Sequence, residues 1–403
     1  MKKKFKNQLA ELDTAGLAMV EATSLDGRYF QSKGKTFIDY CTTNYLGFDF
    51  NPHMHEKGSE YMKNWGSLTG WSRLEADPVI YSNLEKRIQN FLGSGEVILS
   101  HTITITNFSL IPAIAQKGVI FCDHKVHTVV YEACRLARDH GSELVRFQHQ
   151  DLEDLEKKLN EFKDITPKLI AVDGVYSIST EFAPIPELLA LCEKYDAWLY
   201  VDDAHGFGVL GSNPNEHSSY GHGGKGIISY YNQSYDRVFY VTSFGKAYCT
   251  HTAFATIPKL YPETMRDKCL QYIYSAPQSP YVIGMVDAAL DLNEQIGHEE
   301  RQKLQKITTH FVEGMRAMNL KVQNNINFPV VFWEVGTLPQ LIEVAKKMME
   351  HGILAGLRAF PVVPEDECGF RFGLTSLHTV EQIEKTLKSI KQIMSECVFE
   401  EVA

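Results

Sequence analysis

The chain has 403 residues, of which 44% are hydrophobic and 22% charged, and its formal net charge is −10. This length fits two or three packed domains, and the composition is that of an ordinary globular protein. The acidic balance argues against nucleic acid or an anionic membrane as the main partner. No uncharged apolar stretch of about 18 residues occurs, so we expect no membrane-spanning segment.

The eight cysteines are scattered singly without a Cys-x-x-Cys pair, and the fifteen histidines show no His-Glu-x-x-His or paired Cys/His spacing. This pattern is typical of reduced thiols in a cytosolic protein and not of a disulfide framework or a zinc site. The first residues also lack the apolar core and cleavage site of a signal peptide. We therefore expect a cytoplasmic protein without a metal.

Residues 95–260 alternate short β-branched runs with segments of helical apolar spacing. This alternation predicts parallel strands joined by crossover helices, and hence an α/β sheet. In chain order the predicted elements are strand Glu96–Leu99, strand Val119–Cys122, helix Thr128–His140, strand Leu144–Phe147, helix Asp151–Phe162, strand Leu169–Val172, helix Ile185–Lys194, strand Ala197–Val201 and strand Val238–Thr242.

After about Gly284 the pattern changes to that of a smaller α+β domain. The predicted elements there are helix Glu299–Met318, strand Val330–Trp333, helix Pro339–His351, strand Phe370–Leu374 and a last helix from Thr379. The sequence therefore predicts an N-terminal segment over 1–50, a large α/β domain over 51–290 and a smaller α+β domain over 291–403.

Two acids, Asp202 and Asp203, arrive abruptly at the carboxyl end of a nearly all-apolar strand. Ligands of open α/β sheets bind just outside such strand ends. Asp203, and His205 after it, could simply cap the next element. Asp202 is harder to explain in that way, because an acid that closes a buried strand needs a cationic or hydrogen-bonding partner.

Gly206, Gly208 and Gly211 match the G-x-G-x-x-G pattern of dinucleotide-binding proteins and follow a strand. The next residues, Ser-Asn-Pro-Asn at 212–215, interrupt the chain where the phosphate-binding helix must begin. A nicotinamide dehydrogenase is therefore a less favoured alternative.

Further along, an apolar strand runs into the hydroxyls of Thr242 and Ser243 and then into Phe244-Gly245-Lys246. A lysine directly after a buried strand is costly unless it is exposed, paired or neutral. A Schiff base to a cofactor meets this need, and burial leaves the free amine available as nucleophile and base. The two hydroxyls suit a phosphate alongside. Taken alone, Lys246 would be interpreted as an exposed lysine in a loop. Its occurrence together with a strand that ends in Asp202 favours a cofactor site instead.

Seven motifs occur in order along the chain. They are Thr43–Gly47, Thr69–Leu74, Asp123–His127, Asp173–Ser177 with Ala183–Glu187, Val201–Gly211, Ser243–Lys246, and Arg371–Leu374 with His378-Thr379. Together they resemble the motifs of the α-oxoamine synthases. These fold-type-I pyridoxal-phosphate enzymes include serine palmitoyltransferase, 8-amino-7-oxononanoate synthase, glycine C-acetyltransferase and 5-aminolevulinate synthase. The resemblance implies a large domain with a central, mostly parallel sheet and a smaller C-terminal α+β domain.

The resemblance also implies a role for each matching residue. Lys246 would carry pyridoxal phosphate as a Schiff base and move protons at the substrate Cα, and Asp202 would keep the pyridine nitrogen protonated. His205 and Ser177 would hydrogen-bond the phenolic oxygen, and His127 would stack on the ring. Lys246, His127, Asp202 and His205 are thus the predicted catalytic residues.

Backbone amides at Ile103 and Thr104, together with Ser243, would bind the cofactor phosphate. Ser275 would reach the phosphate of a neighbouring subunit, because members of this family build their sites across a homodimer interface.

Arg371, with Asn44, would bind the carboxylate of an amino acid as a charge-assisted pair. The implied reaction is decarboxylative condensation of the amino acid with an acyl thioester, carried on coenzyme A or an acyl carrier protein, to give an α-amino ketone. Asp173, residues 274–276 and residues 360–364 most resemble serine-palmitoyltransferase-like members, which suggests a long acyl chain. An aminotransferase or lyase on the same fold and a non-catalytic partner subunit are the alternatives.

Three positions depart from the family pattern. The phosphate turn at 101–107 lacks its usual glycine, so we expect a different backbone path there. Bulkier residues at 247–252 replace a glycine-rich stretch and are predicted to re-line the cavity, and Trp71 stands where a small residue is usual. These departures predict a specialised substrate with cofactor binding retained.

Overall fold

The computed structural model describes residues 2–397, and their contacts divide them into two compact units. The larger unit consists of Leu46–Ser177 and Glu181–Glu299. The smaller unit consists of Ile178–Thr180 together with the described residues before Leu46 and after Glu299. Within residues 2–397, no helix combines the length and the apolar character that crossing a bilayer requires.

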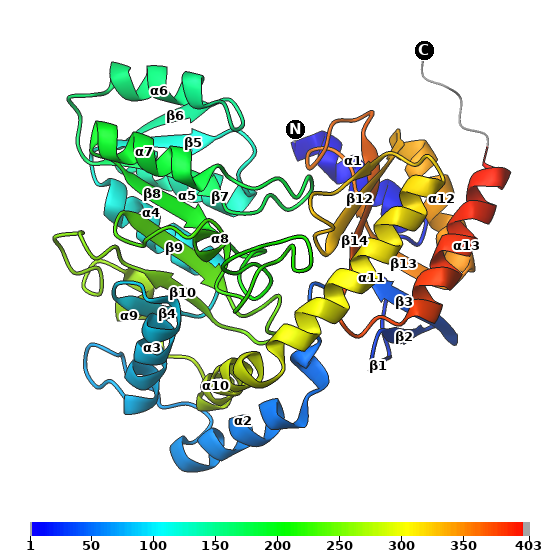
Figure 1. Cartoon of the computed structure of the whole chain (residues 1–403), viewed down its shortest axis with the longest axis horizontal. Helices are drawn as coiled ribbons and strands as arrows, with labels where there is room; N and C mark the ends of the chain where they lie inside the picture. The colour runs from blue at the N-terminus through cyan, green and yellow to red at the C-terminus, as the bar shows by residue number, and fades with distance from the viewer. Residues whose placement is uncertain (1, 398–403) are drawn as a thin grey trace. The chain divides into compact units, whose positions relative to one another are not determined.

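A seven-stranded sheet forms the centre of the larger unit (Figure 1). In spatial order its strands are β4 (Val97–Ser100), β10 (Ala253–Thr256), β9 (Val238–Ser243), β8 (Trp198–Asp202), β7 (Lys168–Asp173), β5 (Val119–Asp123) and β6 (Glu143–Phe147). β10 runs antiparallel to β4 and β9, and the pairs from β9 to β6 are parallel. β5 and β7 are buried at every residue, which explains their continuous apolar runs.

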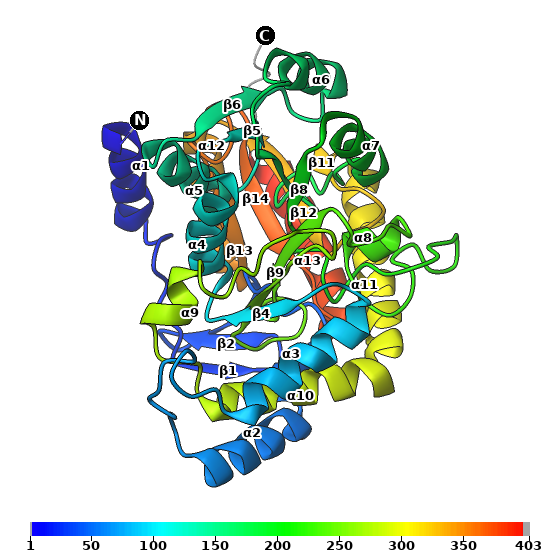
Figure 2. The same ribbon diagram turned by 90° about the vertical axis from the view of Figure 1, so that its left-hand side faces the viewer.

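Helices cover both faces of this sheet. α4 (Ile103–Ala115) and α5 (Thr128–Asp139) pack together on one face, where they share a core with the strands (Figure 2). On the other face, Phe121 of β5 meets Phe162, which directly follows α6 (Leu152–Glu161). The remaining helices of this unit are α2 (Pro52–Trp65), α3 (Val79–Leu92), α7 (Ile185–Tyr195), α8 (Ile227–Tyr230), α9 (Leu270–Tyr274), α10 (Pro280–Gln295) and the short 3-10 helix η1 (Phe48–Phe50).

The smaller unit contains its own seven-stranded sheet. In spatial order the strands are β1 (Ser24–Asp26), β2 (Tyr29–Ser32), β3 (Lys35–Tyr40), β13 (Ile353–Arg358), β14 (Cys368–Gly373), β12 (Val330–Gly336) and β11 (Val322–Gln323). β3 and β13 form the parallel pair, whereas the other neighbours are antiparallel. Its helices are α1 (Lys2–Thr14), most of α11 (Gly297–Ala317), α12 (Leu338–Glu350) and α13 (Val380–Glu396).

The predicted strands and helices are all present, with ends that differ by up to three residues. The α/β class with a smaller α+β part is therefore confirmed.

The sequence analysis predicted no helix at α2, α3, α4 or α10, and of these α4 lies at the predicted phosphate turn. Its first four residues are Ile-Thr-Ile-Thr, and β-branched residues have low helix propensity. Packing decides otherwise, because the buried Leu110, Ile111 and Ile114 of α4 belong to the core of the larger unit. The Thr102 side chain caps the helix by accepting a hydrogen bond from the Ile105 N–H at 3.3 Å.

Candidate active site

Polar residues gather where the parallel strands of the larger unit end. Asp202 at the end of β8 lies opposite Asp173 at the end of β7, and Asp123 ends the next strand, β5. On the other side of β8, Ser243 ends β9 and Lys246 follows in a turn. The predicted lysine and aspartate thus share the sheet edge at which ligands of open α/β sheets bind.

Asp202 is buried and takes part in a hydrogen-bonded chain of side chains. Its Oδ2 accepts from the Asn107 amide at 2.9 Å, and the Tyr200 hydroxyl donates to Asn107 Oδ1 at 2.5 Å. Its Oδ1 accepts from the Ala204 N–H at 3.2 Å. All these donors are neutral and leave the negative charge of Asp202 unbalanced. A cation beside Asp202 would therefore be favourable. Asn107 was missed as a site residue, although it stands one helical turn after Ile103 in the phosphate-turn motif.

The predicted phosphate-binding residues, Ile103 and Thr104, are the first two residues of α4. The first N–H groups of a helix have no intrahelical acceptor, and together with the helix dipole they form an anion site. Both residues are accessible, Thr104 more so than Ile103. The turn without glycine therefore leads directly into a helix whose N-terminus can bind a phosphate.

Ser243 lies at the same sheet edge as this helix N-terminus. Ser243 is opposite Ala253 of β10, which is opposite Ser100 at the end of β4. The Ser243 hydroxyl donates to the Thr252 carbonyl at 3.1 Å and accepts from the Gly245 N–H at 2.9 Å. Ser243 is half-buried, and these bonds hold the turn that leads to Lys246.

His127, Ser177 and His205 all lie in segments that follow the strands of this edge. His127 caps α5, and its backbone N–H donates to Asp173 Oδ2 at 2.9 Å, while its ring is exposed. His205 is buried in the turn after Asp202, and Ser177 is half-buried in the turn after β7. The fold therefore brings these three predicted residues to the edge that holds Asp202.

Lys246 is half-buried in a turn that packs closely against the glycine-rich loop. Gly208 has a positive φ of 87°, and a Cβ added there would lie 2.4 Å from the Ala247 Cβ. Burial, and then the charge of Asp202, raise the pKa of Asp173 well above its usual range, while the charge of Lys246 acts in the opposite direction. Lys246 is thus close enough to Asp173 to act on it electrostatically.

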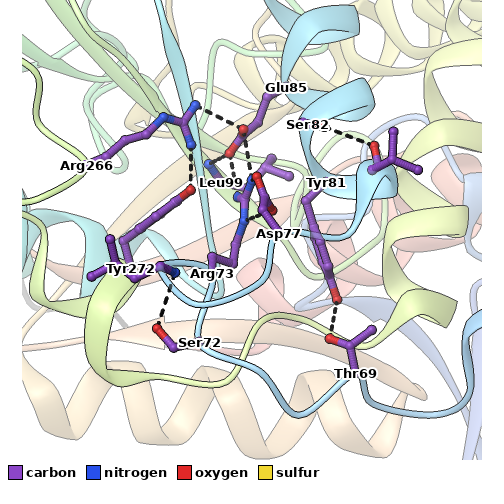
Figure 3. Close-up of polar contacts among 12 residues, drawn as sticks. Thr69, Ser72, Arg73, Asp77, Tyr81, Ser82, Glu85, Leu99, Arg266 and Tyr272 are labelled. Carbon is purple, nitrogen blue, oxygen red and sulfur yellow. Dashed lines mark hydrogen bonds and ion pairs between the residues drawn. The ribbon is translucent and has the colours of Figure 1, made fainter.

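A cluster of charged side chains binds β4, the strand that leads into the phosphate turn (Figure 3). The Arg73 guanidinium lies between the rings of Tyr81 and Tyr272 and donates to Glu85 at 2.6 Å. Glu85 also accepts from the Leu99 N–H of β4 at 3.1 Å. A further ion pair joins Arg266 to Glu85 at 3.0 Å, and Asp77 binds Arg73 at 2.7 Å. The cluster therefore connects the loop that carries Arg73, helix α3 and the segment at Arg266 to β4, the strand before α4.

Ser275 directly follows α9 and lines a small pocket beside this cluster. The pocket is also lined by Arg73, Ser100 and His101, which places Ser275 near the entry to the phosphate turn of its own chain.

We expect Arg73→Lys to lower the free energy of unfolding by about 2 kcal/mol, because lysine keeps the charge but loses the planar fork that binds two carboxylates and stacks between two rings. Urea denaturation measures this change. Lys194→Gln is the matched control, since its partner Glu156 is exposed and the pair should add no measurable stability. Equal losses in the two variants would show that the cluster stabilises the protein no more than an exposed ion pair does.

In the smaller unit, Arg371 lies buried on β14. Its guanidinium donates a hydrogen bond to the Tyr45 hydroxyl oxygen, and burial raises the pKa of Tyr45 to about 12, against the influence of Arg371. The second predicted carboxylate-binding residue, Asn44, directly precedes Tyr45 and is half-buried.

A second arginine, Arg358 of β13, accompanies Arg371 and was missed by the sequence analysis. Arg371 lies opposite Gly356, and a Cβ added to Gly356 would lie 3.1 Å from Arg358 Nη1, so the Arg358 guanidinium covers this glycine. Burial, and then the charge of Arg371, lower the pKa of Arg358 to about 10. Two neighbouring guanidiniums on one sheet face make a site for an anion.

Comparison with known proteins agrees with this arrangement. Residues 66–390 match the model of the aminotransferase class I and II family. The chain is 30% identical over 373 residues to an 8-amino-7-oxononanoate synthase of Methylobacillus flagellatus, covering 92% of this chain and 90% of that protein. The chain belongs to the α-oxoamine synthases. A second 8-amino-7-oxononanoate synthase, from Chromobacterium violaceum, is 30% identical over 94% of this chain and 95% of its own length.

Solved structures support the same family. A serine palmitoyltransferase of Sphingomonas wittichii superposes with a TM-score of 0.86 at 25% identity, covering 98% of this chain and 97% of that one. An 8-amino-7-oxononanoate synthase of Francisella tularensis shares the fold with a TM-score of 0.72. As an α-oxoamine synthase, the protein is a pyridoxal-phosphate-dependent acyltransferase.

The residues at the sheet edge fit pyridoxal phosphate. The first amides of α4, at Ile103 and Thr104, suit the phosphate, and the buried carboxylate of Asp202 suits a protonated pyridine nitrogen. Lys246 follows the strand beside Asp202, where its amine can hold the cofactor. This α-oxoamine synthase therefore offers hydrogen-bond donors to the phosphate and an acceptor to the protonated pyridine nitrogen.

Two predictions about hydroxyl and bulky groups near Lys246 need correction. Thr242 is fully buried and its hydroxyl donates to the Asp203 carbonyl at 2.9 Å, so it is not available to a phosphate. Ala247 and Tyr248 are also fully buried, and Tyr248 packs against Phe207 with ring centroids 5.0 Å apart. Only the more accessible residues of the 247–252 stretch can line a cavity.

The glycine motif after β8 serves packing and does not begin a dinucleotide-binding helix. No helix follows Gly211 directly; the next one in the chain is α8, beginning at Ile227. A Cβ on Gly206 would lie 2.2 Å from Asp203 Oδ1, so this glycine makes room for a buried acid. Asp203 in turn accepts from the Ile227 N–H at 2.8 Å, which is the capping role that the sequence suggested for it.

Proposed function

We propose that this protein condenses an amino acid with an acyl thioester, with loss of the amino-acid carboxyl group as carbon dioxide, to form an α-amino ketone. The observation that carries the proposal is the placement of Lys246 and Asp202 at the ends of the adjacent strands β9 and β8 in a chain of the α-oxoamine synthase family. When bound, pyridoxal phosphate supplies an electron sink for the bonds at the substrate Cα.

The chain's own residues would supply positioning and proton transfer. The Lys246 amine would hold the cofactor between turnovers, take the proton from the substrate Cα and return it to the product. Asp202, held by Asn107, would keep the pyridine nitrogen charged. His127, Ser177 and His205 would fix the orientation of the cofactor ring.

Substrate recognition would fall to the arginines of the smaller unit. Arg371, oriented by Tyr45, presents a guanidinium for the amino-acid carboxylate, with Asn44 as a neutral neighbour. Arg358 adds a second positive charge on the same sheet face. We propose that this pair selects amino acids through their carboxylate.

We also propose that two copies of the chain form a homodimer. Large apolar side chains are exposed on two segments of the larger unit, including Leu74 at 57% and Tyr274 at 81% exposure. The segments lie side by side, since the Ser72 hydroxyl donates to the Ile273 carbonyl at 2.9 Å. Such a surface favours a protein partner, and a second copy would bring its Ser275 to this interface.

The experiment that tests the proposed function is a titration of the holoenzyme with a panel of amino acids, followed by acyl thioesters. We expect one small amino acid to change the cofactor absorption, and a second change together with thiol release when the thioester is added. Palmitoyl and shorter acyl groups on coenzyme A or on an acyl carrier protein distinguish chain length and carrier. Turnover of the amino acid without any thioester would instead indicate an aminotransferase or lyase.

A further inference from the structure

A histidine outside the predicted site lies between two carboxylates at the same edge of the large sheet. His149 follows β6, and its Nδ1 is 2.9 Å and 3.1 Å from the two carboxylate oxygens of Asp123. Its Nε2 is 3.0 Å from Glu181 Oε2. A neutral imidazole has a single N–H, so contacts of both nitrogens with carboxylates indicate an imidazolium that donates on both sides.

One of these carboxylates organises the segment that carries His127. Asp123 is buried at the end of β5 and accepts from the Lys125 N–H at 2.7 Å, which fixes the turn into His127. At the other end of this turn, the His127 N–H donates to Asp173 at 2.9 Å. The position of His127 therefore depends on two acids, and His149 balances the charge of one of them.

The other carboxylate belongs to the segment that flanks Ser177. The Tyr176 N–H donates to the Glu181 carbonyl at 3.0 Å, and the Tyr176 ring meets the His149 ring edge-on at 4.5 Å. Moving Glu181 would thus also move the residue directly before Ser177.

Gln150 repeats the bridge that His149 makes. Its N–H donates to Asp123 Oδ2 at 3.0 Å, and its side-chain amide donates to the Phe182 carbonyl at 3.0 Å. Its φ of 56° is in the left-handed region, which a non-glycine residue adopts only where its surroundings require it. Two consecutive residues therefore connect Asp123 with residues 181–182.

We propose that His149 is a positioning residue that joins the segment carrying His127 to the segment carrying Ser177, and so sets how the two hold the cofactor. The inference rests on the proposed cofactor contacts of these two residues, and it does not depend on which substrate is condensed. His149 itself touches neither cofactor nor substrate in this account.

The charge on His149 gives this arrangement a pH dependence. The charged and titratable groups that face the ring are Asp123 from β5, Lys125 from the turn after β5, and Tyr176 and Glu181 from the segment after β7. Burial lowers the pKa of His149, but its hydrogen bonds to the carboxylates outweigh burial and leave the pKa above its ordinary value. The bridge is therefore complete where His149 is protonated and both carboxylates are ionised, and it is lost as pH rises through this raised pKa.

His149→Gln tests the proposal in the holoenzyme, with the visible circular dichroism of the bound cofactor as readout. We expect the variant to keep the cofactor through Lys246, to bind it roughly tenfold more weakly, and to show a reduced dichroic band. The alkaline change of this band in the wild-type protein should be absent from the variant. Lys194→Gln, which breaks an exposed ion pair between α6 and α7, should leave all three properties unchanged.

Glu181→Ala is the second variant, because it keeps the His149–Asp123 contact and removes the acceptor on the far side of the bridge. A similar loss of dichroism is expected, and this variant decides the question if His149→Gln does not fold. Unchanged dichroism and cofactor affinity in a variant that is only less heat-stable would overturn the proposal. A wild-type protein that binds the cofactor but condenses nothing would contradict the proposed function and leave this test intact.

Discussion

Lys246→Ala is expected to abolish the visible absorption of lysine-bound cofactor and to lower kcat by at least ~10³-fold. The amine is both the attachment point of the cofactor and the proposed base at the substrate Cα, and no other group can supply both functions from the turn after β9. Absorption spectra of the purified variant with added pyridoxal phosphate, followed by steady-state assays, measure the two effects.

Lys225→Ala provides the matched control. Lys225 is also half-buried in the larger unit, but its ammonium lies 5.5 Å from the centroid of the Phe91 ring, a structural contact. This variant should keep the absorption band and the activity. If Lys246→Ala kept the band and Lys225→Ala lost it, the cofactor lysine would be misassigned.

Asp202→Asn is expected to retain the cofactor but to lower kcat by about 10²–10³-fold, as when a preorganised electrostatic partner is removed from an active site. A neutral amide cannot balance a protonated pyridine nitrogen. The Asn107 amide, which donates to Asp202 Oδ2 at 2.9 Å, would also face the NH2 group of the new asparagine, which is itself a donor. Cofactor absorption as a function of pH, together with kcat, measures the change.

Asp203→Asn is the neighbouring control. Asp203 is fully buried, burial raises its pKa to about 7, and it accepts from the Tyr240 hydroxyl at 2.8 Å. Its replacement should lower the stability of the larger unit while the folded protein keeps the cofactor spectrum. Identical spectral changes in the two variants would mean that Asp202 has no special relation to the pyridine nitrogen.

Most strands of the larger unit's sheet could be predicted from the sequence because the central ones are buried on both faces, although β10, which is equally buried, was not predicted. Burial produces continuous apolar runs such as β7 and β8, and a charged residue that ends such a run is conspicuous. Asp202 and Lys246 were found in this way, because each follows a long apolar run. Their closeness in space could also be predicted, because the carboxyl ends of parallel strands lie at the same edge of a sheet.

The contacts that orient those residues could not be predicted in the same way. Asn107 meets Asp202 only because α4 packs on the sheet, and the β-branched start of α4 reads as a strand or turn. His149 meets Asp123 and Glu181 because β5, β6 and β7 align in a particular register, which the sequence of one strand does not contain.

In the sheet of the smaller unit, the pairing of strands that lie far apart in the sequence could not be predicted either. β3 pairs in parallel with β13, with Ile38 opposite Ile353, so that residues near the two ends of the chain share one sheet. Arg358 became recognisable as a partner of Arg371 only through this sheet, in which Gly356 leaves room for its guanidinium. In the sequence, Arg358 looks like an ordinary surface arginine, because no neighbouring residue marks it as buried.

The most direct test of the central claim follows the carboxyl carbon of the amino acid. The holoenzyme is supplied with an acyl thioester and with the amino acid that changes its cofactor spectrum, labelled in the carboxyl carbon. We predict labelled carbon dioxide and free thiol in a one-to-one ratio, with an unlabelled α-amino ketone as product. Consumption of the amino acid with the label retained in the product, or without thiol release, would contradict decarboxylative condensation.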